Sequence, residues 1–226
     1  MTYDERNVLI AGTRNLLILG AGAFARETAV MVNNINQSYP GSWNIIGYLE
    51  RGDERRGQLL EGYPIISYDD LDEYASNDIY AVAAIGNPKI KEVAVKDAEK
   101  IGCRFTTLIH PSVIFADQKT TRIGAGSIIC AGCILAVAVT IGNHVIINFD
   151  CTIGHDVIIE DYATLSPGCH ISGFNVLREK SFLGTGVVTV EHREVGARSI
   201  VGAGAAVVSN IPPDVTAVGL PAKPKS

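Results

Sequence analysis

The stretch that decides the fold is residues 123–212. It divides into sixes as IGAGSI, ICAGCI, LAVAVT, IGNHVI, INFDCT, IGHDVI, IEDYAT, LSPGCH, ISGFNV, LREKSF, LGTGVV, TVEHRE, VGARSI, VGAGAA and VVSNIP. The first residue is Ile, Leu or Val in fourteen of these fifteen hexapeptides, and Thr189 is the exception. The fifth residue is Ala, Ser, Cys or Val in twelve of them. Neither the helical period of 3.6 nor the strand period of 2 gives a strict six, whereas a solenoid whose faces each take six residues does.

The six-residue period therefore predicts a left-handed parallel β-helix. The aliphatic first position is expected to fill a narrow core, and the small fifth position lets the chain turn a tight corner. Three faces close one coil, so each coil takes 18 residues and rises by about 4.8 Å through strand-to-strand hydrogen bonding.

The cysteines fit the same frame. Cys133, Cys151 and Cys169 are 18 residues apart and are expected to stack at one corner of successive coils, as structural residues and not as a metal or redox motif. The chain has five cysteines, an odd number, and residues 1–12 do not resemble a signal peptide. These features favour reduced thiols and a cytoplasmic location.

Residues 15–109 alternate strand-like and helix-like runs. Strands are predicted at 16–19, 44–49, 79–85 and 105–109, and helices at 24–36, 69–75 and 88–101. Buried strands that alternate with helices imply a parallel sheet covered by helices. We therefore predict an α/β, Rossmann-like domain over residues 1–110, followed by the β-helix domain over 111–226.

Composition excludes two classes of partner. The formal charge of −5, without a basic stripe, argues against a nucleic-acid surface. No run of 18 uncharged apolar residues occurs, so no membrane span is expected.

Five motifs in this order resemble one family. They are GAGAFARE at 20–27, IGN at 85–87, IHP at 109–111, GHD at 154–156 and VGLPAK at 218–223. Together with the hexapeptides they resemble the hexapeptide acyltransferases, and within them the bacterial sialic acid O-acetyltransferases and UDP-4-amino-sugar N-acetyltransferases. The resemblance implies a homotrimer that uses acetyl-CoA as co-substrate and no metal. It also implies a nucleotide-sugar acceptor that is acetylated on an amine during bacterial glycan biosynthesis.

The resemblance also assigns catalytic residues. His155 matches the family's general base, Asp156 the acidic residue that orients it, and Asn148 a nearby polar partner. An imidazole can take a proton from an attacking nucleophile near neutral pH, which acyl transfer from a thioester requires. The other histidines are weaker candidates: His110 is expected at the domain junction, His144 and His170 on solenoid turns, and His192 in a bulge or loop.

Two groups of binding residues follow from the resemblance. The expected sugar-nucleotide contacts are Gly22, Ala23, Phe24, Glu50, Arg51, Gly86 and Asn87, which all follow predicted strand ends, where open α/β sheets bind ligands. The expected acetyl-CoA contacts are Thr164, Gly173, Thr185 and Ala203. Two structural alternatives remain open here. The glycine loop also fits a dinucleotide motif, and Gly173 could serve only as a turn residue with positive φ.

Other functions were weighed against this one. A γ-type carbonic anhydrase shares the β-helix but needs three zinc-binding histidines, two of them about five residues apart, and no pair here has that spacing. O-acetylation of sialic acid or another sugar hydroxyl, and a non-catalytic trimeric sugar-nucleotide scaffold, remain as alternatives.

Overall fold

The computed structural model describes residues 13–71 and 79–225. The described residues fall into two compact units, one ending at Pro111 and the other beginning at Ser112. None of the helices in these ranges is long and apolar enough to cross a membrane.

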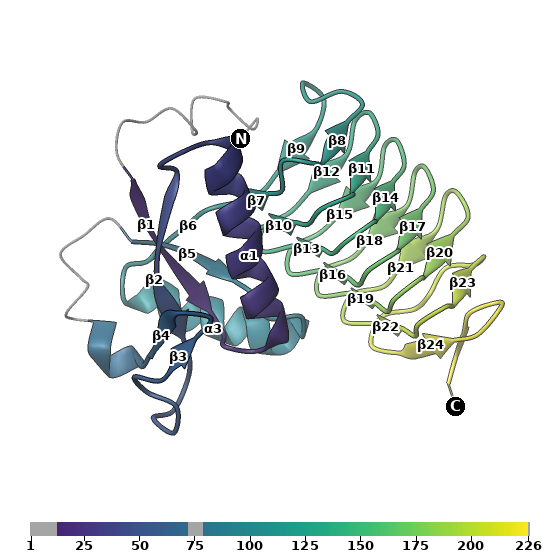
Figure 1. The fold of residues 1–226 in the computed structure, drawn as a ribbon. Coiled ribbons are helices and arrows are strands. Elements are labelled where there is room, and N and C mark those ends of the chain that lie inside the picture. The colour runs from purple at the N-terminus through teal and green to yellow at the C-terminus, as the bar shows by residue number, and fades with distance from the viewer. Residues whose placement is uncertain (1–12, 72–78, 226) are drawn as a thin grey trace. The chain divides into compact units, whose positions relative to one another are not determined.

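The N-terminal unit is built on a twisted, mostly parallel sheet with the strand order β3-β4-β2-β1-β5-β6 (Figure 1). Its elements are β1 (Arg14–Leu19), α1 (Ala23–Ser38), β2 (Trp43–Leu49), β3 (Leu59–Leu60), β4 (Tyr63–Ile66), η2 (Tyr68–Asp70), β5 (Ile79–Ala83), α3 (Pro88–Lys100), β6 (Arg104–Phe105) and β7 (Leu108–Ile109). The α/β alternation predicted from the sequence is confirmed. Its core includes the four fully buried residues at 16–19, in the central strand β1.

Three predicted elements differ from the structure. The helix predicted at 69–75 is the short 3₁₀ helix η2 where the chain is described, and residues 72–78 lie outside the described ranges. The strand predicted at 105–109 is two short strands, β6 and β7. Strand β5 ends at Ala83 and not at residue 85, so that Ile85 is available to line a cavity.

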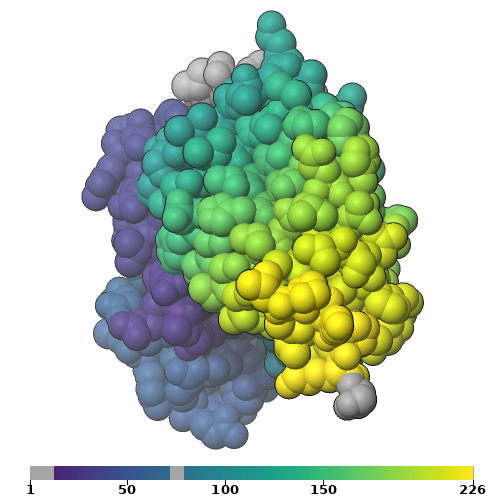
Figure 2. All heavy atoms as spheres, turned by 90° about the vertical axis from the view of Figure 1, so that its right-hand side faces the viewer, coloured from purple at the N-terminus to yellow at the C-terminus, as the bar shows by residue number. Residues whose placement is uncertain are grey.

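The solenoid unit consists of two-residue strands, each formed by the sixth residue of one hexapeptide and the first of the next. They are β8 (Ile114–Phe115), β9 (Arg122–Ile123), β10 (Ile128–Ile129), β11 (Ile134–Leu135), β12 (Thr140–Ile141), β13 (Ile146–Ile147), β14 (Thr152–Ile153), β15 (Ile158–Ile159), β16 (Thr164–Leu165), β17 (His170–Ile171), β18 (Val176–Leu177), β19 (Phe182–Leu183), β20 (Val188–Thr189), β21 (Glu194–Val195), β22 (Ile200–Val201), β23 (Ala206–Val207), β24 (Thr216–Val218) and β25 (Lys223–Pro224). Every third strand joins the same parallel sheet, which gives three sheets that we name by their strands β10–β22, β8–β23 and β9–β21. Figure 2 shows the coils advancing steadily from teal to yellow.

The core of the solenoid is the one predicted. All fifteen first-position side chains are at most 8 % exposed. Thr189, the one polar member, accepts a hydrogen bond at Oγ1 from the backbone N–H of Ser172 at 2.9 Å, and Ser172 Oγ donates to its carbonyl at 2.6 Å. A buried hydroxyl with its hydrogen bonds satisfied is tolerated in a core. The unit TVEHRE is therefore regular, and the bulge or loop predicted around His192 is wrong.

The 18-residue register holds through the middle and changes at both ends. Thr140 pairs with Ile158, and Ile158 with Val176, at 18 residues each. At the start Ile114 pairs with Ile134, a spacing of 20. At the end Val195 pairs with Ile211, a spacing of 16. The repeat therefore begins before Ile123, and the fifteenth hexapeptide is two residues short, which corrects the unbroken frame read from the sequence.

A left-handed residue at the fourth position makes every corner. Each fourth-position residue from 126 to 204 has a φ between +54° and +78°. Nine of these fourteen residues are not glycine, although this conformation is uncommon for a side chain with a Cβ. Parallel pairing with the coils on either side holds each corner in place. For example, the N–H of Asp156 donates to the carbonyl of Val137 at 3.1 Å.

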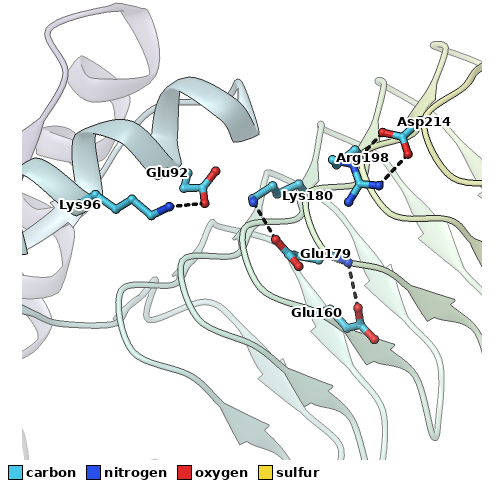
Figure 3. A network of polar contacts seen from close by, with 7 residues as sticks. All are labelled: Glu92, Lys96, Glu160, Glu179, Lys180, Arg198 and Asp214. Atoms are coloured by element: carbon cyan, nitrogen blue, oxygen red, sulfur yellow. Dashed lines mark hydrogen bonds and ion pairs between the residues drawn. The ribbon is translucent and has the colours of Figure 1, made fainter.

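Charged side chains reinforce the corner between the β9–β21 and β10–β22 sheets (Figure 3). Glu160 Oε2 accepts a hydrogen bond from the backbone N–H of Glu179 at 2.9 Å, and Lys180 Nζ pairs with Glu179 Oε1 at 2.7 Å. Further along, Arg198 holds Asp214 through two contacts of 2.6 Å. Exposed pairs of this kind contribute little individually, so this corner serves the outer surface of the coils and not the core.

Candidate active site

A cavity of about 590 Å³ opens at the carboxyl ends of the strands in the N-terminal unit. It is lined by Gly20, Leu49, Glu50, Arg51, Tyr68, Ile85, Lys89, Ile90, Val93 and Ala94. Strand β1 lies between β2 and β5, and the chain leaves it toward β2 on one side and runs from β5 to β6 on the other. The cavity therefore lies at a topological switch point, where doubly wound sheets bind ligands.

Arg51 is the charged side chain best placed at the rim of this cavity. It forms an ion pair with Asp97 of α3 and a hydrogen bond with Tyr68. The hydrogen bond from Arg51, followed by that from Lys100, holds the pKa of Asp97 below its ordinary value. Burial chiefly raises the pKa of Tyr68, so this hydroxyl stays neutral. The rim thus offers a fixed cation beside a neutral phenol.

The remaining predicted acceptor contacts flank the cavity without lining it. Gly22 is the N-cap of α1 and has no side-chain cap, so the first N–H groups of that helix have no capping side chain. Ala23 and Phe24 form its first turn, and Gly86 precedes α3. Asn87 is the N-cap of α3, where its Oδ1 accepts hydrogen bonds from the N–H groups of Lys89 and Ile90 at 3.0 and 3.2 Å.

Arg55 is a residue at this site that sequence reasoning missed. Its Nε donates to Glu50 at 2.9 Å and its Nη2 to the carbonyl of Ala21, in the glycine loop, at 3.2 Å. It thereby ties the second strand's exit to the first loop and places a guanidinium beside the start of α1. A search for cations after the second strand would have found it, but its contact to the loop depends on the fold.

His155 and Asp156 lie at the corner between β14 and β15. Nδ1 of His155 is 3.0 Å from Oδ2 of Asp156, and the two side chains are 45 % and 44 % exposed. An ionised carboxylate only accepts hydrogen bonds, so Nδ1 carries the proton and Nε2 keeps a lone pair. The pair predicted from the sequence is therefore assembled within one chain, with the second nitrogen able to accept a proton.

The next coil shapes the surroundings of this imidazole. A Cβ placed on Gly173 would lie 2.6 Å from Cε1 and 2.7 Å from Nε2 of His155. The φ of Gly173 is not in the positive region, so its alternative role as a positive-φ turn residue is wrong. Phe174 meets the His155 ring edge-on, with centroids 4.9 Å apart and an angle of 87°. His192 stacks on Phe174 at 4.6 Å and 4°. Neither aromatic contact was predicted.

The other predicted solenoid residues occupy separate places. Asn148 lies one corner before His155 along the chain, and its Oδ1 accepts a hydrogen bond from the N–H of Phe149 at 2.8 Å. Thr164 is buried in β16. Thr185 and Ala203 lie one coil apart at the corner between the β10–β22 and β8–β23 sheets. Within the described residues of one chain, Gly173 is the predicted acetyl-CoA contact that meets His155.

The cysteine stack is structural. The Sγ of Cys133 and of Cys169 donate to backbone carbonyls of Asn148 and Gly184 at 3.0 and 3.3 Å, and all three stacked thiols are buried. Hydrogen bonding within the stack and burial raise the pKa of Cys151 to about 12. Across residues 13–71 and 79–225 no group of three or more His, Cys, Asp or Glu residues is arranged to hold a metal.

The remaining histidines have structural contacts. His144 lies at a left-handed corner, as predicted, and stacks on Tyr162. His170 is in strand β17 and not on a turn, with Nδ1 2.9 Å from Oγ1 of Thr152. His110 Nε2 is 3.2 Å from Nδ2 of Asn34, and burial lowers its pKa.

Comparisons with known proteins agree with this architecture. The PglD N-terminal domain matches residues 15–98, and the bacterial transferase hexapeptide (six repeats) matches residues 138–173. A GDP-perosamine N-acetyltransferase from Escherichia coli O157:H7 is 29 % identical over 171 residues, which are 76 % of each chain.

Solved structures match the described fold over nearly the whole chain. The acetyltransferase domain of PglB from Neisseria gonorrhoeae is 29 % identical with a TM-score of 0.83, over 94 % of this chain and all of that one, and it has also been solved with acetyl coenzyme A. PerB from Caulobacter crescentus, solved with CoA and GDP-perosamine, is 26 % identical with a TM-score of 0.84, over 96 % and 99 % of the two chains. The chain thus belongs to the hexapeptide-repeat sugar acetyltransferases that carry a PglD N-terminal domain.

Proposed function

We propose that this protein transfers the acetyl group of acetyl-CoA to the amine of a nucleotide-linked 4-amino sugar, in bacterial glycan biosynthesis. The observation that carries the proposal is the His155–Asp156 pair, whose Nδ1–Oδ2 contact of 3.0 Å leaves Nε2 to act as a base on an exposed corner of the solenoid. The similar GDP-perosamine N-acetyltransferase and PerB are named for an acceptor of this class or were solved with one.

The proposed reaction needs one base and no metal. Nε2 of His155 takes a proton from the sugar amine as its nitrogen attacks the thioester carbonyl. The carboxylate of Asp156 stabilises the imidazolium that forms, because it accepts the Nδ1–H. The tetrahedral intermediate then collapses, the C–S bond breaks, and the proton passes to the CoA sulfur. The products are the N-acetyl sugar nucleotide and free CoA.

The cavity of the N-terminal unit is the proposed nucleotide site. Its apolar wall, formed by Leu49, Ile85 and Val93 among others, suits one face of a base. Glu50 and Arg51 at the rim provide hydrogen-bonding groups. The N-terminus of α1 after Gly22 and the neighbouring Arg55 are suited to the diphosphate. Phe24, Gly86 and Asn87 complete this proposed contact set.

Acetyl-CoA is proposed to bind along the solenoid. Gly173 lies against the base, and Thr185 and Ala203 present small, exposed side chains at another corner. Because these contacts lie at separate corners of one chain, we propose that a homotrimer completes the site, with Thr164 and Asn148 as further contributors. Acetyl-CoA and nucleotide sugars are cytoplasmic metabolites, so we place the enzyme there.

The deciding experiment follows thiol release from acetyl-CoA with a panel of GDP-, UDP- and dTDP-linked 4-amino sugars, their 4-hydroxy counterparts and free sialic acid. We expect release with at least one amino sugar, and its loss in His155→Ala. Light scattering of the same samples gives the oligomeric state.

Three outcomes separate the alternatives. Turnover with hydroxyl acceptors alone assigns O-acetylation. Tight binding of a nucleotide sugar without thiol release, in a protein that also fails to bind acetyl-CoA, assigns the scaffold role. Undiminished turnover in His155→Ala rejects the base.

A further inference from the structure

Three aromatic rings follow one another along the corner that carries the proposed base. Residues 156, 174 and 192 occupy the same left-handed position on consecutive coils. The N–H of Phe174 donates to the carbonyl of His155 at 3.0 Å, and the N–H of His192 donates to the carbonyl of Gly173 at 3.1 Å. The coil pairing therefore fixes the backbone beneath the rings of His155, Phe174 and His192.

We propose that Phe174, backed by His192, is a positioning residue that holds the imidazole of His155 in its reactive orientation. This proposal goes beyond the pairing with Asp156 and rests on His155 being the base of the proposed reaction.

Three contacts restrict the imidazole from different directions. Asp156 holds Nδ1 at 3.0 Å. The backbone of Gly173 lies so close to Cε1 and Nε2 that no methyl group fits between. Phe174 closes the third direction with an edge contact at 4.9 Å. Asp156 alone would leave a half-exposed ring free to turn about its bonds, so the aromatic contact is what limits the remaining rotation.

His192 gives Phe174 its support. Phe174 is 45 % exposed, and a bulky residue with φ of +58° is conformationally unfavourable. The parallel contact of His192 at 4.6 Å covers one ring face. An exposed aromatic residue kept in a strained conformation, with one neighbour on the proposed base and the other behind it, fits a role in holding that base.

The size of the effect follows from the contact. An aromatic pair contributes about 1 kcal/mol beyond its buried area, which corresponds to about fivefold in a rate. Loss of orientation adds to this, because a general base must lie within hydrogen-bond reach of its proton. We expect Phe174→Leu to lower kcat by about five- to tenfold and to leave the KM for acetyl-CoA within about twofold. Phe174→Tyr keeps the ring and should recover most of the loss.

Tyr162 offers a matched control. It has the same left-handed conformation, with φ of +61°, and stacks on His144 at 5.1 Å and 17°. It lies at a different corner from His155, between β15 and β16. Tyr162→Leu therefore removes a comparable ring contact from the solenoid without touching the base, and His192→Asn removes only the supporting ring.

The test combines steady-state kinetics with nitrogen-detected histidine spectra of the intact protein, in which His155→Ala assigns the His155 signals. We expect one Nδ1–H tautomer for His155 in the wild type and in Tyr162→Leu. We expect a tautomer average in Phe174→Leu and a partial one in His192→Asn.

The two proposals fail in different ways. An unchanged His155 spectrum in Phe174→Leu overturns the positioning role whether or not an acceptor is known, and so does an equal loss of kcat in Tyr162→Leu. Full turnover in His155→Ala removes the base itself, while the spectra still report whether Phe174 orders the ring.

Discussion

Substitution of Gly173 by alanine separates the site from the fold more sharply than any other single change. The new methyl carbon would lie 2.6 Å from Cε1 of His155, whereas ordinary contacts begin at 3.4 Å. The imidazole must therefore withdraw by roughly 3.4 − 2.6 = 0.8 Å, and Phe174 obstructs one direction of escape. Misplacement of a catalytic group by about 1 Å can cost on the order of 100-fold in rate. We expect kcat to fall by about 10- to 100-fold, or roughly 1.4–2.7 kcal/mol in the activation barrier.

The coil itself should tolerate this change. The nearest atoms to the added methyl all belong to the His155 side chain, which is half-exposed and can move. The φ of Gly173 is also not in the positive region, so alanine is not strained there. Gly154 provides the contrast, because a Cβ on it would lie 2.7 Å from the backbone nitrogen of Gly173 and 2.8 Å from the carbonyl carbon of Ser172. We expect Gly154→Ala to lower the melting temperature and Gly173→Ala to leave it near that of the wild type.

The assay is thiol release with the acceptor found in the panel, run beside thermal unfolding of both variants. A Gly173→Ala enzyme with wild-type kcat would refute the reasoning from the overlap. An increase in the KM for acetyl-CoA alone would assign Gly173 to the co-substrate and not to the base. A fall in the melting temperature as large as that of Gly154→Ala would mean that the backbone, and not the ring, absorbs the methyl.

Three further predictions follow from other contacts. Thr189→Val leaves the buried N–H of Ser172 without its acceptor, and we expect urea denaturation to show a loss of about 1–3 kcal/mol in unfolding free energy; unchanged stability would contradict the role assigned to the hydroxyl. Iodoacetamide at pH 8 should label the half-buried Cys103 before the stacked thiols, because Cys151 is buried and its pKa is about 12; peptide mapping that finds Cys151 modified as fast as Cys103 would exclude the stack. Arg178 chiefly lowers the pKa of Glu194, so the stability from this pair is present above the unfolded pKa of about 4.5 and is lost as the pH falls through the lower folded pKa. Wild-type protein should thus lose more stability than Arg178→Met below pH 4.5, and parallel acid-unfolding curves would contradict the assignment.

The solenoid could be predicted from the sequence because its period is local. The inner first and fifth positions recur every six residues, and no other regular structure gives that period. The two ends could not be predicted, because the spacing of 20 between Ile114 and Ile134 and that of 16 between Val195 and Ile211 are set by short irregular segments. A frame of six continues through such segments whenever an aliphatic residue falls by chance on the expected position, as Val207 does.

The contacts of the N-terminal cavity were less accessible to sequence reasoning. Glu50 and Arg51 could be proposed because they follow a predicted strand, and strand ends of a parallel sheet meet at one edge. Tyr68 and Lys89 reach the same cavity from η2 and α3. Their participation depends on how these elements pack on the sheet, which no local pattern in the chain specifies.

The corner at His155 shows how far the repeat itself can guide the search for a site. Positions one and five are committed to the core, so chemistry on a solenoid face is left largely to positions three and four, which form the corners. A residue at position three of one coil then meets residues 18 and 19 further along, which are Gly173 and Phe174 for His155. The ring behind them lies another 18 residues on, at His192. A histidine followed by a glycine at 18 and an aromatic residue at 19 is therefore a spacing that indicates a base with room on one side and a wall on the other, and it can be sought in other hexapeptide chains before their structures are known.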